Sequence, residues 1–121
     1  MKAEIKGYMT TDCDPLEGYK PVDFDYFSVD IEVAIGVEGA VGSDSFIFTV
    51  TTPKYLESKI DGEDVIFLRH YILVKKWNPD LIKGRLEKLV SSTSGNNWEE
   101  LAGKFSRFGR WEFEDVRPVK D

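Results

Sequence analysis

The sequence predicts an α+β fold: a single domain over residues 1–121, with a mainly antiparallel sheet of about five strands. Two longer helices and one short helix pack on one face of this sheet. Residues 27–35 alternate strictly between apolar and mostly polar positions, and the strand patterns do not alternate regularly with the helical ones. With 121 residues, 41% of them hydrophobic and 13% aromatic, the chain can bury one core without disulfides or metals.

Five segments have strand patterns, separated by turn residues or by helices. In residues 27–35 the odd positions are apolar, as in an antiparallel strand with one packed and one solvated face. The glycines of residues 36–42 predict a hairpin. Residues 65–74 have apolar side chains on both faces of the predicted strand, which predicts a central strand. The predicted strands are residues 2–8, 27–35, 45–52, 65–74 and 111–116, with a loop over residues 10–21.

Three helices are predicted from capping residues and apolar spacing. Thr52-Pro53 and Asn78-Pro79 each place a capping side chain before a proline at the first helical position. Asn97 caps a third helix, whose apolar residues recur at helical spacing over residues 98–108. The predicted stop signals are Asp61-Gly62, Ser91 to Asn96, and Gly109.

The formal net charge is −6, and it is unevenly distributed. Residues 1–64 hold 14 acidic and 5 basic residues, a net charge of −9, whereas residues 65–121 hold 8 acidic and 11 basic residues, a net charge of +3. Between Asp12 and Glu38 there are eight acids and only Lys20 as a base. An acidic surface repels nucleic-acid backbones and speeds encounter with basic proteins. The simpler interpretation is a solvated face that keeps the protein soluble.

The cysteine count and the first residues bear on the compartment. Cys13 is the only cysteine, so no internal disulfide forms, and the neighbouring Asp12 and Asp14 make its thiol a poor nucleophile. The alternating, charged Met1–Lys6 has no apolar signal core, and no segment reaches the roughly 18–20 apolar residues of a membrane span. We therefore expect a protein of the reducing cytoplasm.

No catalytic motif is present in the sequence. His70, the single histidine, lies in a predicted strand without an orienting partner or ligands at metal spacing. Asp30 and Glu32 share a strand face and could serve a small acidic-site enzyme or hold a divalent ion, but exposed strand faces commonly carry such residues. Phosphate-loop and dinucleotide fingerprints are absent. We expect no enzyme activity, no cofactor and no metal.

Three aromatic segments leave alternatives open. Lys75-Lys76-Trp77 and Arg107 to Arg110 combine cations with aromatic rings, as in a small nucleic-acid- or protein-binding adaptor. The scattered basic residues and the negative net charge disfavour nucleic acid. In residues 111–115, the two aromatic residues either fill the core from a terminal strand or face a partner. The two-residue alternation favours the core.

Several segments, taken in order and spacing, resemble the immunity protein 8 family of bacterial polymorphic toxin and contact-dependent inhibition systems. Val116 departs from the resemblance, because an aromatic residue is expected after Glu114-Asp115. The segments that carry the resemblance are Pro21 with Asp23-Phe24-Asp25, Phe27-Ser28-Val29, Ile35-Gly36, Gly42 to Phe46, Val50 to Leu56, Trp98, and Ser106 to Asp115.

The resemblance implies a protein that functions by binding. Its partner would be the C-terminal catalytic domain of a cognate toxin, encoded by a neighbouring gene, and such toxins are often nucleases with basic clefts. Nucleic acid and membrane are not expected as partners. The uneven charge distribution, rather than the family motifs, predicts that the toxin-binding surface lies in the acidic segment between Asp12 and Glu38. The expected toxin-binding residues are Asp23, Asp25, Asp30, Glu32 and Glu38.

Overall fold

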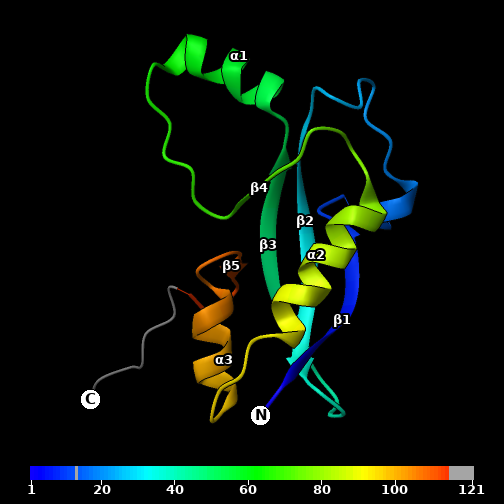
Figure 1. The fold of residues 1–121 in the computed structure, drawn as a ribbon, viewed down its shortest axis with the longest axis vertical. Helices are drawn as coiled ribbons and strands as arrows, with labels where there is room; N and C mark the ends of the chain where they lie inside the picture. The colour runs from blue at the N-terminus through cyan, green and yellow to red at the C-terminus, as the bar shows by residue number, and fades with distance from the viewer. Residues whose placement is uncertain (13, 115–121) are drawn as a thin grey trace.

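The computed structural model describes residues 1–12 and 14–114 and has an α+β architecture (Figure 1). Cys13 and residues 115–121 lie outside the described residues, so the predictions for Cys13, Asp115 and Val116 are not tested here. None of the described helices is long and apolar enough to cross a membrane. The elements are β1 Ala3–Thr10, η1 Leu16–Gly18, β2 Ser28–Val37, β3 Asp44–Thr51, α1 Pro53–Glu63, β4 Tyr71–Leu73, α2 Pro79–Ser91, α3 Trp98–Phe105 and β5 Arg110–Trp111.

The five-stranded sheet confirms the mainly antiparallel prediction. Strands β1, β2 and β3 pair antiparallel in chain order, and the far edge of β3 is shared by two short strands. β4 pairs in parallel with Thr49–Thr51, and β5 pairs antiparallel with Phe46 and Ile47. β3 is therefore an interior strand whose outer edge is divided between two elements from different parts of the chain.

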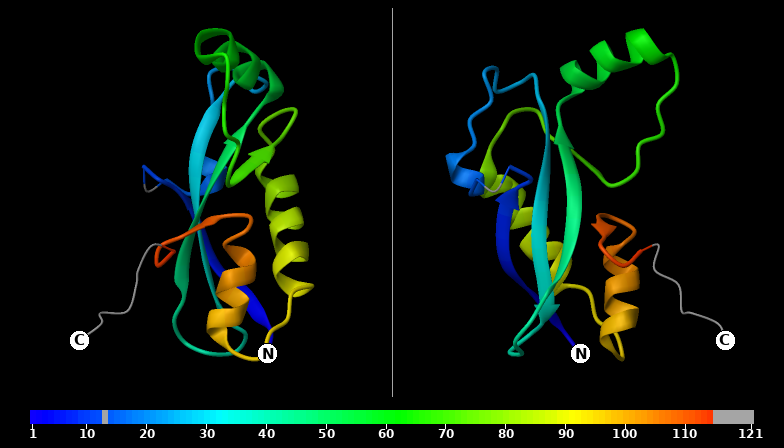
Figure 2. Two further views of the ribbon diagram at one scale, coloured as in Figure 1. Left: turned by 90° about the vertical axis from the view of Figure 1, so that its left-hand side faces the viewer. Right: turned by 180° about the vertical axis from the view of Figure 1, so that it is seen from behind.

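The alternation along β2 sends its side chains to two different environments. Ile31, Val33 and Ile35 are at most 1% exposed and share one core cluster with residues of α2 and α3, the helices that cover this side of the sheet (Figure 2). The core lies between the sheet and these two helices. The helices contribute Ile82, Leu86 and Val90 from α2, and Leu101, Ala102 and Phe105 from α3.

All three predicted helix caps are present. The side-chain oxygens of Thr52, Asn78 and Asn97 each accept a hydrogen bond from a backbone N–H in the first turn of α1, α2 and α3, respectively. The predicted turn at Asp61-Gly62 is wrong, because α1 continues to Glu63 and has 11 residues. A glycine in an exposed helix costs only about 1 kcal/mol, which does not suffice to end it.

The predicted central strand over residues 65–74 is also wrong. Only Tyr71–Leu73 pairs with β3, at the edge of the sheet, and His70 precedes this strand with a φ of +65°. Val65 and Phe67 are 70% and 92% exposed. The apolar run belongs mainly to a connection, because β5 occupies the other half of the β3 edge and leaves room for only three residues of β4.

The end of the described chain differs from the prediction in two ways. α3 ends at Phe105, and Phe108 is 49% exposed instead of continuing the apolar face of the helix. β5 contains only Arg110–Trp111. Trp111 packs against the core, as predicted, but Phe113 is 45% exposed and contacts the Trp111 ring edge-on at 5.8 Å between centroids.

Candidate functional site

The face of the sheet opposite α2 and α3 is covered by none of the described helices. Seen from behind, β1, β2 and β3 lie in front of α2 (Figure 2). The register places Asp30 beside Thr49 and Glu32 beside Ile47 on this open face. On the other side of β3, Ile47 pairs with Arg110 of β5. The open face is therefore a solvent-accessible β-surface with two carboxylates near its centre.

Hydrogen bonds from β3 hold both central carboxylates in place. Asp30 Oδ1 accepts from Thr49 Oγ1 at 2.7 Å, and Glu32 Oε1 accepts from Ser45 Oγ at 2.8 Å. Both acids are half-buried, and neither takes part in an ion pair among the described residues. Each carboxylate has lone pairs left to accept a donor from a partner.

The other three acids expected to bind a toxin lie beyond the ends of β2. Asp23 and Asp25 belong to the segment before it, and Glu38 follows it in the hairpin turn. A strand rises about 3.3 Å per residue, so Glu38 is roughly 25 Å from Asp30. The structure brings Asp30 and Glu32 together on β2. It places Asp23 and Asp25 just before the start of β2, and Glu38 just after its end.

Asp25 is partly neutralised by the start of α1. Lys54 Nζ lies 2.6 Å from Asp25 Oδ2. The hydrogen bond from Lys54 lowers the pKa of the Asp25 carboxyl, and the same contact raises the pKa of the Lys54 ammonium. Because both groups are exposed, this pair presents a compensated charge to a partner, in contrast to Asp30 and Glu32.

Of the residues considered for catalysis, the structure describes His70, Asp30 and Glu32 but not Cys13. Within residues 1–12 and 14–114, no three His, Cys, Asp or Glu side chains are grouped so that they could hold a metal ion. The His70 ring does find partners: its Nε2 lies 2.9 Å from the Ser106 carbonyl and 3.4 Å from Glu114 Oε1. These contacts join the residue before β4 to the segments on both sides of β5, which is a structural function.

Trp77 cannot serve as a stacking platform for the predicted basic–aromatic adaptor. It is 5% exposed, and the rings of Tyr19 and Phe27 contact it edge-on at 4.9 and 5.5 Å between centroids. Lys75 and Lys76 remain exposed beside it. The Lys75-Lys76-Trp77 segment therefore presents cations without an accessible aromatic face.

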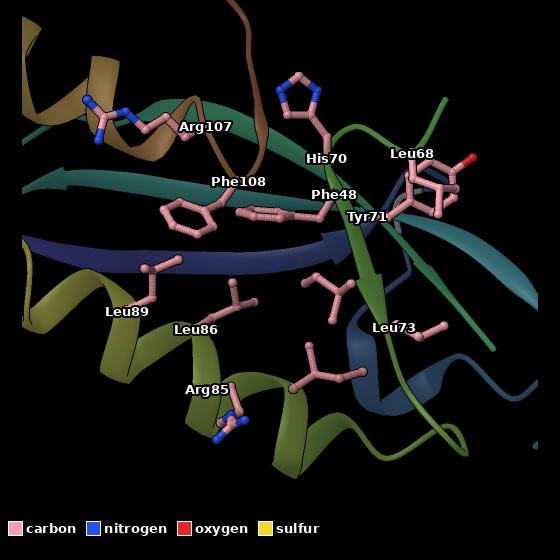
Figure 3. A pocket seen from close by; sticks show the side chains of 12 residues that line it. Phe48, Leu68, His70, Tyr71, Leu73, Arg85, Leu86, Leu89, Arg107 and Phe108 are labelled. Carbon is pink, nitrogen blue, oxygen red and sulfur yellow. The ribbon is translucent and has the colours of Figure 1, made fainter. Parts of the chain in front are cut away.

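Sequence reasoning missed an apolar groove between β4, α2 and the end of α3. Figure 3 shows the rings of Phe48 and Phe108 beside Leu86 and Leu89, with Arg85 and Arg107 at the edges. The depression has a volume of about 450 Å³. The signal in the sequence is the apolar run 65–74 followed by Lys75 and Lys76, but the composition of this run predicts a central strand and not a groove.

Comparison with known families identifies the kind of protein that carries these surfaces. A family model described as Immunity protein 8 matches residues 3–116, which is nearly the whole chain. The chain belongs to the immunity protein 8 family. No curated protein and no solved structure matches it. Membership in the immunity protein 8 family implies an immunity role with a toxin as partner.

Several residues in the segments that resemble the immunity protein 8 family have structural functions in this fold. Gly42 adopts a φ of +100°, and a β-carbon on Gly36 would lie 2.2 Å from the Gly42 carbonyl oxygen, so the hairpin needs both glycines. Asp44 Oδ2 accepts hydrogen bonds from the indole N–H groups of Trp98 at 2.6 Å and Trp111 at 3.0 Å. These contacts fix α3 and β5 against β3 and leave the open face free.

Proposed function

We propose that this chain neutralises the catalytic domain of a cognate toxin by binding it, without chemistry of its own, through the open face of the sheet. Membership in the immunity protein 8 family supports the immunity role. The observation that carries the choice of surface is the pair Asp30 and Glu32: half-buried carboxylates, without ion-pair partners among the described residues, on a face that no described helix covers.

A basic toxin surface is the natural complement of these two acids. Nuclease clefts are lined with cations that bind phosphates, and a carboxylate surface competes for them. Asp23 and Asp25 extend the acidic surface beyond the start of β2, although Lys54 compensates Asp25. The hydrogen bonds from Thr49 and Ser45 hold the central carboxylates in one position, which reduces the entropy lost on binding. Glu38 lies in the hairpin turn and contributes at most at the periphery.

The immunity role is tested by co-expressing this chain with the C-terminal domain encoded by the neighbouring gene. We expect the domain alone to stop growth, and the pair to grow and to co-purify. A toxic domain that this chain neither binds nor relieves would contradict the proposal.

The binding surface is tested with the double variant Asp30→Asn, Glu32→Gln. These amides keep an acceptor oxygen for Thr49 and Ser45 while removing both charges. We expect toxin affinity to fall by at least roughly tenfold. The matched control is Asp80→Asn, Glu99→Gln, which removes two exposed charges from α2 and α3 on the other side of the sheet. Equal affinity of the two folded variants would assign the toxin to another surface.

A further inference from the structure

A second surface of this protein lies on the side of β4 and is not used by the open-face proposal. Val65, Phe67, Leu68 and Leu73 are between 58% and 92% exposed. Isolated apolar residues on a surface are ordinary, but a contiguous group usually marks an interaction site. Leu68 and Leu73 both line the groove of Figure 3 and an adjoining depression beneath α1, and Val65 and Phe67 lie in the short segment that leads to Leu68.

The helix that precedes this apolar group contacts Asp25 and Tyr26, in the segment before β2, but buries none of its own residues. α1 connects the parallel strands β3 and β4, and crossover helices in such units normally cover a face of the sheet. Here α1 has no buried residue and extends past the end of the sheet (Figure 1). We call residues 53–68, which comprise α1 and the exposed apolar run after it, the arm.

A groove beside the arm is lined by basic and apolar side chains. Between β4 and α2 lies a depression of about 660 Å³, which shares Leu73 and Arg85 with the one shown in Figure 3. We call the two depressions together the basic groove. Among the described residues its lining contains no Asp or Glu, and its cations are Lys75, Lys76, Arg85 and Arg107.

The arm is acidic and apolar where the groove is basic and apolar. Its acids are Glu57, Asp61, Glu63 and Asp64, its bases are Lys54 and Lys59, and Lys54 is already paired with Asp25. The arm therefore carries an excess of negative charge on a helix that has no buried residue. The negative arm of one copy is therefore attracted to the basic groove of another copy. The same arm is repelled by the rest of the protein surface, which is mainly acidic.

We propose that two copies of this chain associate as a two-fold dimer, each placing its arm in the basic groove of the other. An isologous interface requires both complementary surfaces on one chain, on either side of the symmetry axis. The exposed Leu73, on the edge strand β4, lines the depression beneath the arm as well as both parts of the groove. An axis near β4 would bring each arm over the partner's groove and cover the apolar group.

Charge reversal tests this arrangement in a way that a loss of folding cannot imitate. The arm variant is Glu57→Lys, Glu63→Lys, and the groove variant is Lys75→Glu, Arg85→Glu. In sedimentation velocity we expect the unmodified chain to shift from 13.8 kDa towards twice that mass with increasing concentration. Each variant alone should have a dimer dissociation constant that is at least roughly tenfold higher than that of the unmodified chain. A mixture of the two should form a heterodimer, because both of its arm–groove contacts regain opposite charges.

An apolar substitution provides a second test with a matched control. Phe67→Glu places a charge at a 92% exposed position on the arm, and Val41→Glu does the same at a fully exposed position in the hairpin between β2 and β3. We expect only Phe67→Glu to abolish the dimer, with the melting temperature of the isolated monomer unchanged in both variants. A chain that stays monomeric at all concentrations, or a mixture of arm and groove variants that does not associate, would overturn the proposal.

The dimer and the toxin complex are separable by experiment. The arm and groove variants leave Asp30 and Glu32 untouched, so they should bind a toxin domain through the open face as monomers. Retained toxin binding by a monomeric arm variant supports two distinct surfaces. Loss of toxin binding in both arm and groove variants, with no dimer formed by the unmodified chain, would overturn the self-association and assign this surface to the toxin.

Discussion

Gly109 lies against the ring of Phe48 so closely that a β-carbon at position 109 would be 2.6 Å from Phe48 Cζ. Phe48 is a core residue of β3, 2% exposed, and Gly109 comes directly before β5. The glycine is required here by contact, because its φ is not in the left-handed region. The approach of the chain to this ring lets β5 reach the edge of β3.

Replacing Gly109 with alanine should therefore destabilise the fold. The added methyl group would also lie 2.8 Å from Cε1 and Cε2 of Phe48, and a buried aromatic ring cannot move aside without disturbing the core. We expect a loss of about 1–3 kcal/mol in the free energy of unfolding, measured by urea denaturation. The control is Gly103→Ala in α3, where nothing lies within 4 Å of the new atom and helix propensity predicts a gain of up to about 1 kcal/mol. Equal stability of the two variants would contradict the contact.

Asp44 should be the most sensitive acidic residue of the fold. Its carboxylate accepts the indole N–H groups of both Trp98 and Trp111, so Asp44→Ala removes the acceptor of two donors at once. We expect Asp44→Ala to cost about 1–3 kcal/mol or more in unfolding free energy, and Asp44→Asn to cost less because it retains an acceptor oxygen. Tryptophan fluorescence during denaturation measures both. A matched substitution at the exposed Asp12 should be neutral.

Local sequence signals were sufficient to predict the strands and helices that form the core. The alternation of residues 27–35 became β2 with the predicted faces, because a two-residue period allows only one side to be buried. Asparagine and threonine caps located all three helix starts, since each depends on a contact within one turn. The same alternation placed Asp30 and Glu32 together on the solvent-facing side.

The basic groove could not be predicted, because it depends on contacts between distant segments. Residues 65–70 have the composition of a strand, but Arg110 and Trp111 of β5 occupy the β3 edge that a longer β4 would need. Nothing near residue 65 encodes that competition. The spacing between Asp25 and Lys54 likewise gives no signal of an ion pair. Local periodicity therefore predicts core elements well, and predicts poorly which apolar segments stay exposed.

The cap of α3 should contribute stability in proportion to its single hydrogen bond. Asn97 Oδ1 accepts from the Glu100 backbone N–H at 2.9 Å. We expect Asn97→Ala to lower the unfolding free energy by about 1 kcal/mol, because it leaves that donor without its partner in the first helical turn. The neighbouring Asn96 is exposed, and Asn96→Ala should change stability by less than about 0.5 kcal/mol. Urea denaturation of both variants distinguishes a specific cap from a general effect of removing an amide.

Tyr8 should make the stability of the fold sensitive to alkaline pH. Burial, reinforced by the 2.8 Å hydrogen bond to Glu87, raises the pKa of the Tyr8 hydroxyl well above its ordinary value. The unfolded chain then releases this proton at about pH 10 while the folded chain retains it, so stability is full below that pH and falls as the pH rises further. Tyr8→Phe should be less stable at neutral pH but lose less stability between neutral pH and about pH 11. Parallel slopes for the two proteins would show that other groups cause the alkaline loss.

Association with a toxin should depend on salt through Asp30 and Glu32. Exposed charges act over a Debye length of about 10 Å at 0.1 M ionic strength, and their main effect is on the association rate constant. If the open face meets a basic toxin surface, that rate constant should fall as salt is added. It should fall less steeply for Asp30→Asn, Glu32→Gln than for the control Asp80→Asn, Glu99→Gln, which has the same net charge. Stopped-flow measurements at two salt concentrations give both slopes. Identical slopes would mean that only the total charge of the protein matters, and that the two carboxylates at the centre of the open face do not approach the toxin.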